Sequence, residues 1–252
     1  MKDFLNMKDK VVCVIGGTGL IGTELANAFD GYGAKVFVGT RVPENFRNKS
    51  NINYIKIDIT SSQSIRRFIS DVIVHDKKID VWINCAWPRQ DNSKGRIEDV
   101  DPDIVGRDTM DHLLGFYRCC KEILINMKKA KHGVIINFSS TYGDLSPDFR
   151  IYKNTEIASL PSYPLIKGGI NTFTKYLACY AAPFNIRVNA ICPGGVLDKH
   201  SRLFQEQYST RVPLRRMADK KDIVGPVLFL ASESASYITG HLLYVDGGLH
   251  AW

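Results

Sequence analysis

Tyr163 and Lys167 are the residues whose types and spacing most directly suggest chemistry. Residues 168–182 have the pattern of a helix, and two residues four positions apart at its start share one face, with Cβ atoms roughly 5–6 Å apart. A phenol has an ordinary pKa near ~10, and an ammonium within about 4–6 Å lowers it by roughly 1–3 units. The pair therefore predicts a tyrosine that serves as a general acid or base near neutral pH.

A serine hydroxyl could hold a substrate oxygen against that phenol. Ser140 ends residues 133–140, an apolar run that predicts a buried strand. Such a strand would bring the hydroxyl to the carboxyl edge of a sheet, where the ligands of α/β proteins bind. Ser139 is the alternative for this role. Because the Tyr-x-x-x-Lys pattern also occurs in ordinary amphipathic helices with a surface lysine, the surrounding sequence has to decide.

A glycine-rich turn near the N-terminus predicts a dinucleotide site. The apolar run Val11–Ile15 has the length of a strand, and residues 23–29 have helical periodicity. The glycines between them permit a tight turn and a close backbone approach, so that a pyrophosphate can lie on the helix N-terminus. The alternative is a purely structural turn. The residues of this turn expected to contact a cofactor are Gly16, Thr18, Gly19, Leu20, Ile21 and Gly22.

The rest of the chain alternates apolar runs of strand length with helical patterns. This alternation predicts right-handed βαβ crossovers, and hence an α/β fold with one doubly wound parallel sheet flanked by helices. We expect one domain over residues 1–252, with a segment of no clear period at residues 143–162 and a basic connecting segment that ends at Arg216. The further strands are expected at residues 34–38, 53–58, 79–83, 186–192 and 242–246, and further helices at residues 61–75, 109–127 and 219–231.

Composition limits the class of protein. The chain has 252 residues, of which 44% are hydrophobic, and none of its apolar stretches approaches the ~20 residues needed to span a bilayer. The N-terminus is polar and has no signal-peptide core, so we expect a cytoplasmic protein without membrane association. The net charge of +7 is spread along the chain, which argues against nucleic acid and favours anionic small molecules. The six cysteines have no metal-ligand spacing, so we expect reduced thiols and no metal site.

Further motifs follow the glycine turn in a definite order. Most fall at or just after the end of a predicted strand, whereas Asn189 lies within one and the tyrosine–lysine pair lies on its helix. Together they resemble the short-chain dehydrogenase/reductase family over residues 10–248. The resemblance implies a Rossmann-type fold, a nicotinamide cofactor, and a homo-tetramer or homo-dimer. The landmarks after the glycine turn are Asp58, Asn84-Cys85-Ala86, Ser140, Tyr163 with Lys167, Asn189, Pro193-Gly194 and Asp246-Gly247-Gly248.

The resemblance also implies a role for each landmark. Tyr163 would donate or accept a proton, Lys167 would support it electrostatically and bind the cofactor ribose, and Ser140 would orient the reacting oxygen. Asp58 is expected at the adenine, although Asp58 or Thr60 also suits the N-cap of the next helix. Besides the glycine turn, the residues expected at the cofactor are Thr40, Arg41, Asp58, Ile59, Asn84, Ala86, Tyr163, Lys167, Pro193, Gly194 and Val196.

The chain departs from the family pattern in three places. Typical members have a threonine before the glycines and a Gly-x-x-x-Gly-x-Gly spacing. In this chain Ile15 precedes the glycines, and Leu20 stands at the second glycine position of that spacing. Trp87 replaces the glycine that usually ends the motif after the fourth strand, and would place a large ring near the nicotinamide or substrate. His112 occupies the position of an asparagine in the family's proton relay. This histidine either serves the relay as a catalytic residue or packs as an ordinary helix residue.

The segment between Ser140 and Tyr163, residues 141–162, is longer than in typical members. It is similar to that of reductases associated with bacterial flagellin modification and surface-sugar biosynthesis. We therefore expect an oxidoreductase that transfers a hydride between a nicotinamide and a carbonyl or secondary alcohol of a sugar derivative, in surface-glycan synthesis or flagellin glycosylation. One alternative, suggested by the glycine spacing, is a sugar-nucleotide epimerase or dehydratase with tightly bound cofactor. Another is a catalytically silent dinucleotide sensor, against which the retained Ser140, Tyr163 and Lys167 argue.

The residues after the second strand favour NADP(H) over NAD(H). A carboxylate there would hydrogen-bond the ribose 2′-hydroxyl of NAD, but the chain has Thr40 followed by Arg41. A guanidinium can bind the 2′-phosphate of NADP through two hydrogen bonds. NAD(H) remains possible because Thr40 does not exclude it.

Basic residues in the segments expected to border the substrate favour an anionic sugar derivative over a steroid or a fatty-acyl chain. The alternative is that they are solvated surface charges. They are Arg89, Arg150, Lys153, Lys199, Arg202 and Arg211.

Overall fold

The computed structural model describes residues 5–46, 52–87, 97–155 and 158–251. Within them the chain forms one sheet of seven strands in the order β3-β2-β1-β4-β5-β6-β7. All neighbouring strands pair in parallel, which confirms the α/β fold expected from the sequence. The strands are β1 (Val11–Ile15), β2 (Lys35–Thr40), β3 (Asn53–Lys56), β4 (Val81–Asn84), β5 (Gly133–Phe138), β6 (Ile186–Pro193) and β7 (Leu242–Val245).

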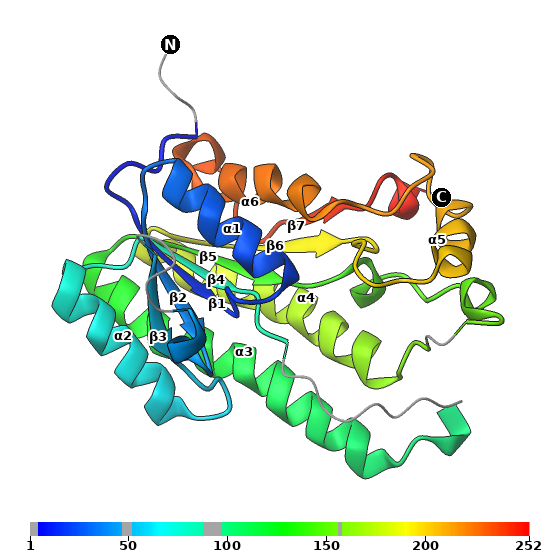
Figure 1. Ribbon diagram of the computed structural model, residues 1–252. Helices are drawn as coiled ribbons and strands as arrows, with labels where there is room; N and C mark the ends of the chain where they lie inside the picture. Colours follow the sequence, from blue (N-terminus) through cyan, green and yellow to red (C-terminus); the bar gives the residue numbers. More distant parts are fainter. Residues whose placement is uncertain (1–4, 47–51, 88–96, 156–157, 252) are drawn as a thin grey trace.

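Helices cover both faces of the sheet (Figure 1). α1 (Leu20–Gly31) and α6 (Val224–Ala231) lie on one face. α2 (Ser62–Asp76), α3 (Pro102–Ala130) and α4 (Ser162–Ala181) lie on the other, and the short α5 (Arg202–Ser209) lies at one end of the molecule. Because both faces are covered, the central strands are apolar along their length and do not alternate. The remaining helical turns are of the 3-10 type, at Pro43–Asn45, Ile97–Asp99, Thr141–Gly143, Phe149–Tyr152, Ala182–Phe184, Lys220–Ile223, Glu233–Ala235 and Leu249–Ala251.

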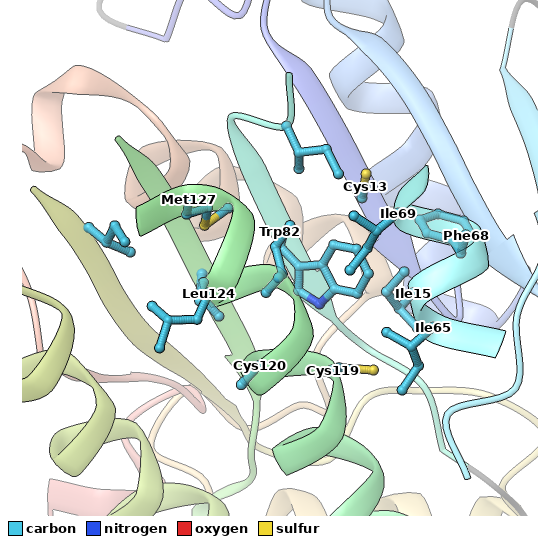
Figure 2. Close-up of a cluster of buried hydrophobic side chains, with 14 of the residues drawn as sticks. Cys13, Ile15, Ile65, Phe68, Ile69, Trp82, Cys119, Cys120, Leu124 and Met127 are labelled. Carbon is cyan, nitrogen blue, oxygen red and sulfur yellow. The ribbon is translucent and has the colours of Figure 1, made fainter. Parts of the chain in front are cut away.

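Trp82 of β4 lies at the centre of the core that joins the sheet to α2 and α3 (Figure 2). It is fully buried, and Phe68 of α2 meets its ring edge-on at a centroid distance of 5.7 Å. Its one polar atom, Nε1, donates to the Asn84 Oδ1 at 2.7 Å, so the indole adds apolar area to the core without an unpaired donor. This packing holds β4 and the residues that follow it in place.

A buried polar chain then links the sheet to α4. The Asn84 Nδ2 donates to the Asn137 Oδ1 at 2.9 Å, and the Asn137 Nδ2 donates to the Thr174 Oγ1 at 3.0 Å. These residues lie on β4, β5 and α4, and all three are buried. Because a buried polar group left unpaired is costly, this chain favours one position of α4 on the sheet. That helix carries Tyr163 and Lys167.

Two helices differ from the sequence-based expectation. α3 begins at Pro102, because the Asp101 Oδ1 caps it by accepting from the Asp103 N–H at 2.8 Å, whereas the apolar pattern alone placed the start near residue 109. α5 lies within the segment expected to be an irregular connection. Its buried residues, Phe204 and Tyr208, pack on Ile151 of a distant segment. A helix with so few buried positions has a weak sequence pattern.

The strand order places the switch point of the sheet between β1 and β4. β1 pairs with β2 on one side and with β4 on the other, so the connections after β1 and β4 leave on opposite faces. The crevice at the carboxyl ends of these two strands is where α/β sheets of this kind bind ligands.

The parts of the chain that the structure describes contain neither a helix long and apolar enough to cross a bilayer nor a cluster of three metal-ligating side chains.

Candidate active site

The glycine turn after β1 fits a dinucleotide because its glycines are needed for shape. Gly16 has a φ of +83°, and a Cβ there would lie 2.5 Å from the Ala86 Cα. A Cβ on Gly22 would overlap the Gly16 carbonyl oxygen. The turn therefore packs directly on the backbone of Cys85 and Ala86, which follow β4, and on the start of α1. Larger side chains at these glycines would push the three segments apart.

The N-terminus of α1 is open to a ligand. Gly19 is its N-cap residue, is exposed and offers no side-chain cap, so the N–H groups of Leu20 and Ile21 have no partner in the helix. A Cβ on Gly19 would meet only the Gly16 carbonyl oxygen, at 3.4 Å, which is an ordinary van der Waals contact, so other protein atoms do not crowd this residue. A helix of this length with uncapped N–H groups and a free approach suits a pyrophosphate.

β2 ends at Thr40, and Arg41 follows it, so neither residue at this strand end is a carboxylate. Thr40 is buried, and its Oγ1 lies 3.2 Å from the Thr18 Oγ1, which ties the strand end to the glycine turn. Arg41, the next residue, is exposed. The hydroxyl pair and the exposed guanidinium therefore border the place where a dinucleotide's adenosine ribose would lie.

Asp58 and Ile59 lie at the turn after β3. The Asp58 Oδ1 accepts from the Thr60 N–H at 2.9 Å and from its hydroxyl at 2.8 Å, so this carboxylate braces the turn. The N-cap of α2 is Ser61, whose side chain accepts from the Ser64 N–H, so the alternative of Asp58 or Thr60 as the cap was wrong. Ile59 is buried.

Asn84 and Ala86 follow β4 but differ in their surroundings. The Asn84 side chain is 1% exposed and bonds within the core to Asn137, so a cofactor could meet only its backbone. The Ala86 backbone packs on Gly16 and faces the glycine turn. Two strands along in the sheet, Pro193 ends β6, and Gly194 and Val196 follow it, with Val196 in an isolated bridge to Ala218.

Ser140 meets Tyr163, whereas Ser139 does not take that place. The Ser140 hydroxyl lies close enough to the Tyr163 phenol to lower the pKa of that phenol. The Ser139 hydroxyl instead donates to the Lys167 carbonyl oxygen at 3.1 Å and is buried under α4. The geometry therefore favours Ser140 as the hydroxyl that can touch a substrate oxygen together with Tyr163.

Lys167 lies one turn after Tyr163 and is almost fully buried. Its Nζ donates to the Phe138 carbonyl oxygen at 2.9 Å and lies 5.7 Å from the Tyr163 ring centroid. Burial lowers the pKa of Lys167 to about 8. Burial also raises the pKa of Tyr163, with the Ser140 hydroxyl acting in the opposite direction. The expectation that the phenol pKa would be lowered was thus wrong, because desolvation is the largest influence on this buried phenol and raises its pKa.

Trp87 lies against His112, Tyr163 and Lys167. The Trp87 ring lies 4.2 Å from the His112 ring and 5.0 Å from the Tyr163 ring, and its centre is 5.0 Å from the Lys167 Nζ. His112 is 1% exposed, and neither of its ring nitrogens has a hydrogen-bond partner among the described residues. Burial, reinforced by the Lys167 charge, lowers the pKa of His112 to about 2, so the ring is neutral at physiological pH.

Three of the six basic residues expected at the substrate form ion pairs with carboxylates of the chain. Arg150 and Arg211 both pair with Asp148, at 2.8 Å and 2.9 Å, and the hydrogen bonds from Arg150 lower the pKa of this carboxyl to about 2. Arg202 pairs with Glu206. Lys153 and Lys199 are exposed, and Arg89 lies outside the described residues.

Tyr142 is a residue of the site that the sequence analysis did not single out. Its ring meets the Tyr163 ring edge-on, with centroids 6.3 Å apart, and its hydroxyl accepts from the Tyr152 hydroxyl at 3.3 Å. Its position two residues after Ser140 was the available signal. Trp87, expected near the nicotinamide or substrate, lies over the catalytic pair.

Known proteins share this sequence and geometry. A family model described as Enoyl-(Acyl carrier protein) reductase matches residues 18–250. Post-translational flagellin modification protein A of Campylobacter coli is 31% identical over 254 residues, which cover 96% of this chain and 98% of that protein. The chain belongs to the short-chain dehydrogenase/reductase family. As a member of this family it is an NAD(P)-dependent oxidoreductase.

Two further members of the family show how far the likeness extends. The 3-oxoacyl-acyl-carrier-protein reductase FabG of Vibrio cholerae is 28% identical over 98% of this chain and 99% of its own. A short-chain dehydrogenase of Leptospira borgpetersenii, solved with bound NAD+, is 34% identical with a TM-score of 0.90, and the match covers 99% of this chain and 96% of that one. The likeness to these short-chain dehydrogenases/reductases thus extends over nearly the whole chain.

Proposed function

We propose that this protein interconverts a carbonyl and a secondary alcohol of a sugar derivative used in bacterial surface-glycan synthesis or flagellin modification, with NADP(H) as the preferred cofactor. The observation that carries the proposal is the placement of the Ser140 hydroxyl beside the Tyr163 phenol at the carboxyl edge of the sheet, near an open dinucleotide turn. The name of the Campylobacter coli relative supports the sugar role. The nicotinamide, when bound, supplies or accepts the hydride.

The chain's own residues handle the proton and orient the substrate. Ser140 and Tyr163 both hydrogen-bond the reacting oxygen. The Tyr163 phenol gives its proton to that oxygen in reduction, and the phenolate form takes the proton from the alcohol in oxidation. Lys167 is the nearby cation that stabilises the phenolate left after proton donation, and it binds the cofactor ribose. The glycine turn with Thr18, Leu20 and Ile21 holds the pyrophosphate. The other residues expected at the cofactor lie on α4 or at and just after the carboxyl ends of β2, β3, β4 and β6.

We assign His112 a hydrogen-bonding role in the proton relay. Two buried ring nitrogens without a partner among the described residues are costly, by roughly 1–3 kcal/mol for each unsatisfied group, unless they are used. They lie beside Trp87 and close enough to Lys167 for its charge to act on the ring. A neutral imidazole can donate and accept at once. His112→Asn should then keep most of the turnover that His112→Phe loses, whereas equal turnover in the two variants would favour simple packing.

The cofactor preference follows from Thr40 and Arg41. A neutral hydroxyl at the end of β2 does not repel a 2′-phosphate, and the exposed guanidinium next to it can bind one. The NAD+ in the Leptospira borgpetersenii relative keeps NAD(H) as the alternative.

The substrate's charge has less support than its class. Three of the six basic residues behind the anionic-sugar hypothesis are paired with carboxylates of the chain, so they are not free to bind an anion without breaking those pairs. We therefore propose a sugar derivative as the substrate and do not assign it a negative charge on the basis of these residues.

We further propose that residues 1–252 act as one catalytic domain in a cytoplasmic homo-dimer or homo-tetramer. One sheet runs from Val11 to Val245, which supports a single domain. The six cysteines are free, as in a reducing compartment. Exposed tyrosines on α3 and α4, Tyr117, Tyr176 and Tyr180, provide an apolar face for a second copy.

The test is a turnover assay. Purified protein with NADPH or NADH is incubated with a panel of keto-sugars and sugar phosphates, and the absorbance of the reduced cofactor is followed, with Tyr163→Phe protein as the control. Substrate-dependent loss of absorbance in the wild type alone supports the proposal. Nucleotide released by heating the purified protein, without net consumption of added cofactor, would instead favour the epimerase or dehydratase alternative.

A further inference from the structure

A cavity of about 1250 Å³ adjoins the catalytic residues. It lies between the Ile97–Asp99 turn, the loop after Ser140 and the first turn of α4, at the end of the molecule that also carries α5 (Figure 1). Tyr142, whose ring meets Tyr163 edge-on, forms part of its wall, as does Pro164 next to Tyr163. Ligand sites commonly enclose about 300–1,000 Å³, so this cavity has room for a substituent beyond a single sugar ring.

The wall of this cavity is largely aromatic and aliphatic. Tyr142 and Tyr152 are joined through their hydroxyls, and Phe149 packs near Tyr152 with ring centroids 6.4 Å apart. Phe149 is nevertheless 68% exposed, and Leu160 lines the same space. Such faces bind the C–H side of a sugar ring or an apolar substituent, because contact removes both surfaces from water.

The charged groups among the described lining residues are carboxylates. Glu98 and Asp144 line the cavity, and that lining contains no lysine, arginine or histidine. The Asp144 Oδ2 accepts from the Tyr244 hydroxyl at 3.1 Å and from the His250 Nε2 at 2.8 Å, while the Asp144 side chain stays 54% exposed. These two hydrogen bonds lower the pKa of Asp144, which keeps it ionised. An anion entering the cavity would therefore meet like charge, whereas hydroxyl or ammonium groups would find acceptors.

Two nearby arginines of the described chain are already paired with another carboxylate, Asp148. Arg150, next to Phe149, forms two hydrogen bonds of 2.8 Å to the Asp148 carboxylate. Arg211 binds the same carboxylate at 2.9 Å. Releasing either guanidinium for a ligand would leave Asp148 with one partner fewer, so an anionic ligand gains little from them.

We propose that this cavity binds an uncharged or cationic hydroxylated ligand with an apolar substituent, such as a neutral or amino glycoside, and disfavours carboxylated and phosphorylated sugars. The inference rests on the proposed function in that this ligand is then the substrate of the Tyr163 site. It replaces the anionic substrate suggested by the basic residues of the sequence.

Three matched probes test the charge preference by calorimetric titration: 4-nitrophenyl β-D-glucoside, the corresponding 2-amino-2-deoxyglucoside and the corresponding glucuronide. Wild-type protein at low ionic strength should bind the first two about tenfold more tightly than the glucuronide. This gap should shrink at high salt, because salt screens the carboxylates. Phe149→Ala should weaken all three, and Glu98→Gln or Asp144→Asn should each narrow the gap. Glu233→Gln, at an exposed carboxylate paired with Lys10, should leave the gap unchanged.

The results of this experiment distinguish failure of the ligand-binding inference from failure of the proposed function. Binding in the expected order supports the inference whether or not the probes are turned over, and absence of turnover across this and the keto-sugar panel would count against the proposed function alone. Equal or tighter binding of the glucuronide would overturn the inference. So would the absence of binding by all three probes, or a gap that neither the Glu98 nor the Asp144 variant changes.

Discussion

Replacing His112 by phenylalanine should make the protein less sensitive to acid. The folded state holds the pKa of this buried imidazole at about 2, below its ordinary value of 6.5. Between those two pH values the unfolded chain binds one more proton at this position than the folded chain, so the free energy of unfolding falls as the pH falls through this window. A residue that is 1% exposed contributes nearly the full slope, about 1.4 kcal/mol per pH unit.

From pH 7.5 to pH 5.0 the wild type should therefore lose about 2 kcal/mol that His112→Phe does not lose. Urea unfolding of both proteins at several pH values and one protein concentration measures this difference. Any packing change caused by the larger ring adds a constant, and the titration of other groups cancels between the two proteins. His241→Asn, at an exposed position, controls for the loss of a histidine. A stability difference that stays constant from pH 7.5 to 5.0 would show that the folded protein protonates His112. That result would refute the assignment of a buried imidazole that stays neutral.

Three other substitutions test the site. Tyr163→Phe should lower turnover by about 10²–10⁴ while cofactor affinity, measured by fluorescence titration, changes little; wild-type turnover would end its role as the proton donor. Arg41→Ala should lower affinity for NADPH by about tenfold and leave NADH affinity unchanged, and an unaltered ratio of the two would show that this guanidinium does not read the 2′-phosphate. Gly22→Ala should lower the melting temperature, because its Cβ overlaps the Gly16 carbonyl oxygen, whereas Gly19→Ala should lower cofactor affinity with little change in melting temperature. Similar effects of the two glycine variants on melting temperature would contradict the separation of a structural glycine from a binding glycine.

The parts of the fold that follow from continuous apolar runs could be predicted from the sequence. β1 has the predicted bounds. A strand that is buried on both faces is apolar at every position, so its apolar run begins and ends where the strand does. α5 and the true start of α3 could not be predicted in this way. One depends on contacts with Ile151 far away in the sequence, and the other on a single capping carboxylate, Asp101.

Some features of the candidate site could likewise be predicted from the sequence, and others could not. The spacing of Tyr163 and Lys167 indicated a shared helix face, and α4 carries both. The resemblance to the family favoured Ser140 over Ser139, and the structure adds the physical reason, because the Ser139 hydroxyl is bound to the Lys167 carbonyl oxygen under α4. The direction of the Tyr163 pKa shift was mispredicted because spacing indicates the nearby charge but not the depth of burial, which here outweighs it.

The two contacts between the end of β5 and the first turns of α4 have a consequence for how this enzyme can diversify. The Lys167 Nζ binds the Phe138 carbonyl oxygen, and the Ser139 hydroxyl binds the Lys167 carbonyl oxygen. These bonds fix both ends of the intervening segment, so residues 144–161 can change length and composition while Ser140 and Tyr163 keep their relative position. Lengthening such a loop costs little, since each doubling of its length adds only about 0.6 kcal/mol of closure entropy. New substrates can therefore be accommodated by rebuilding that loop, with the proton-transfer residues left untouched.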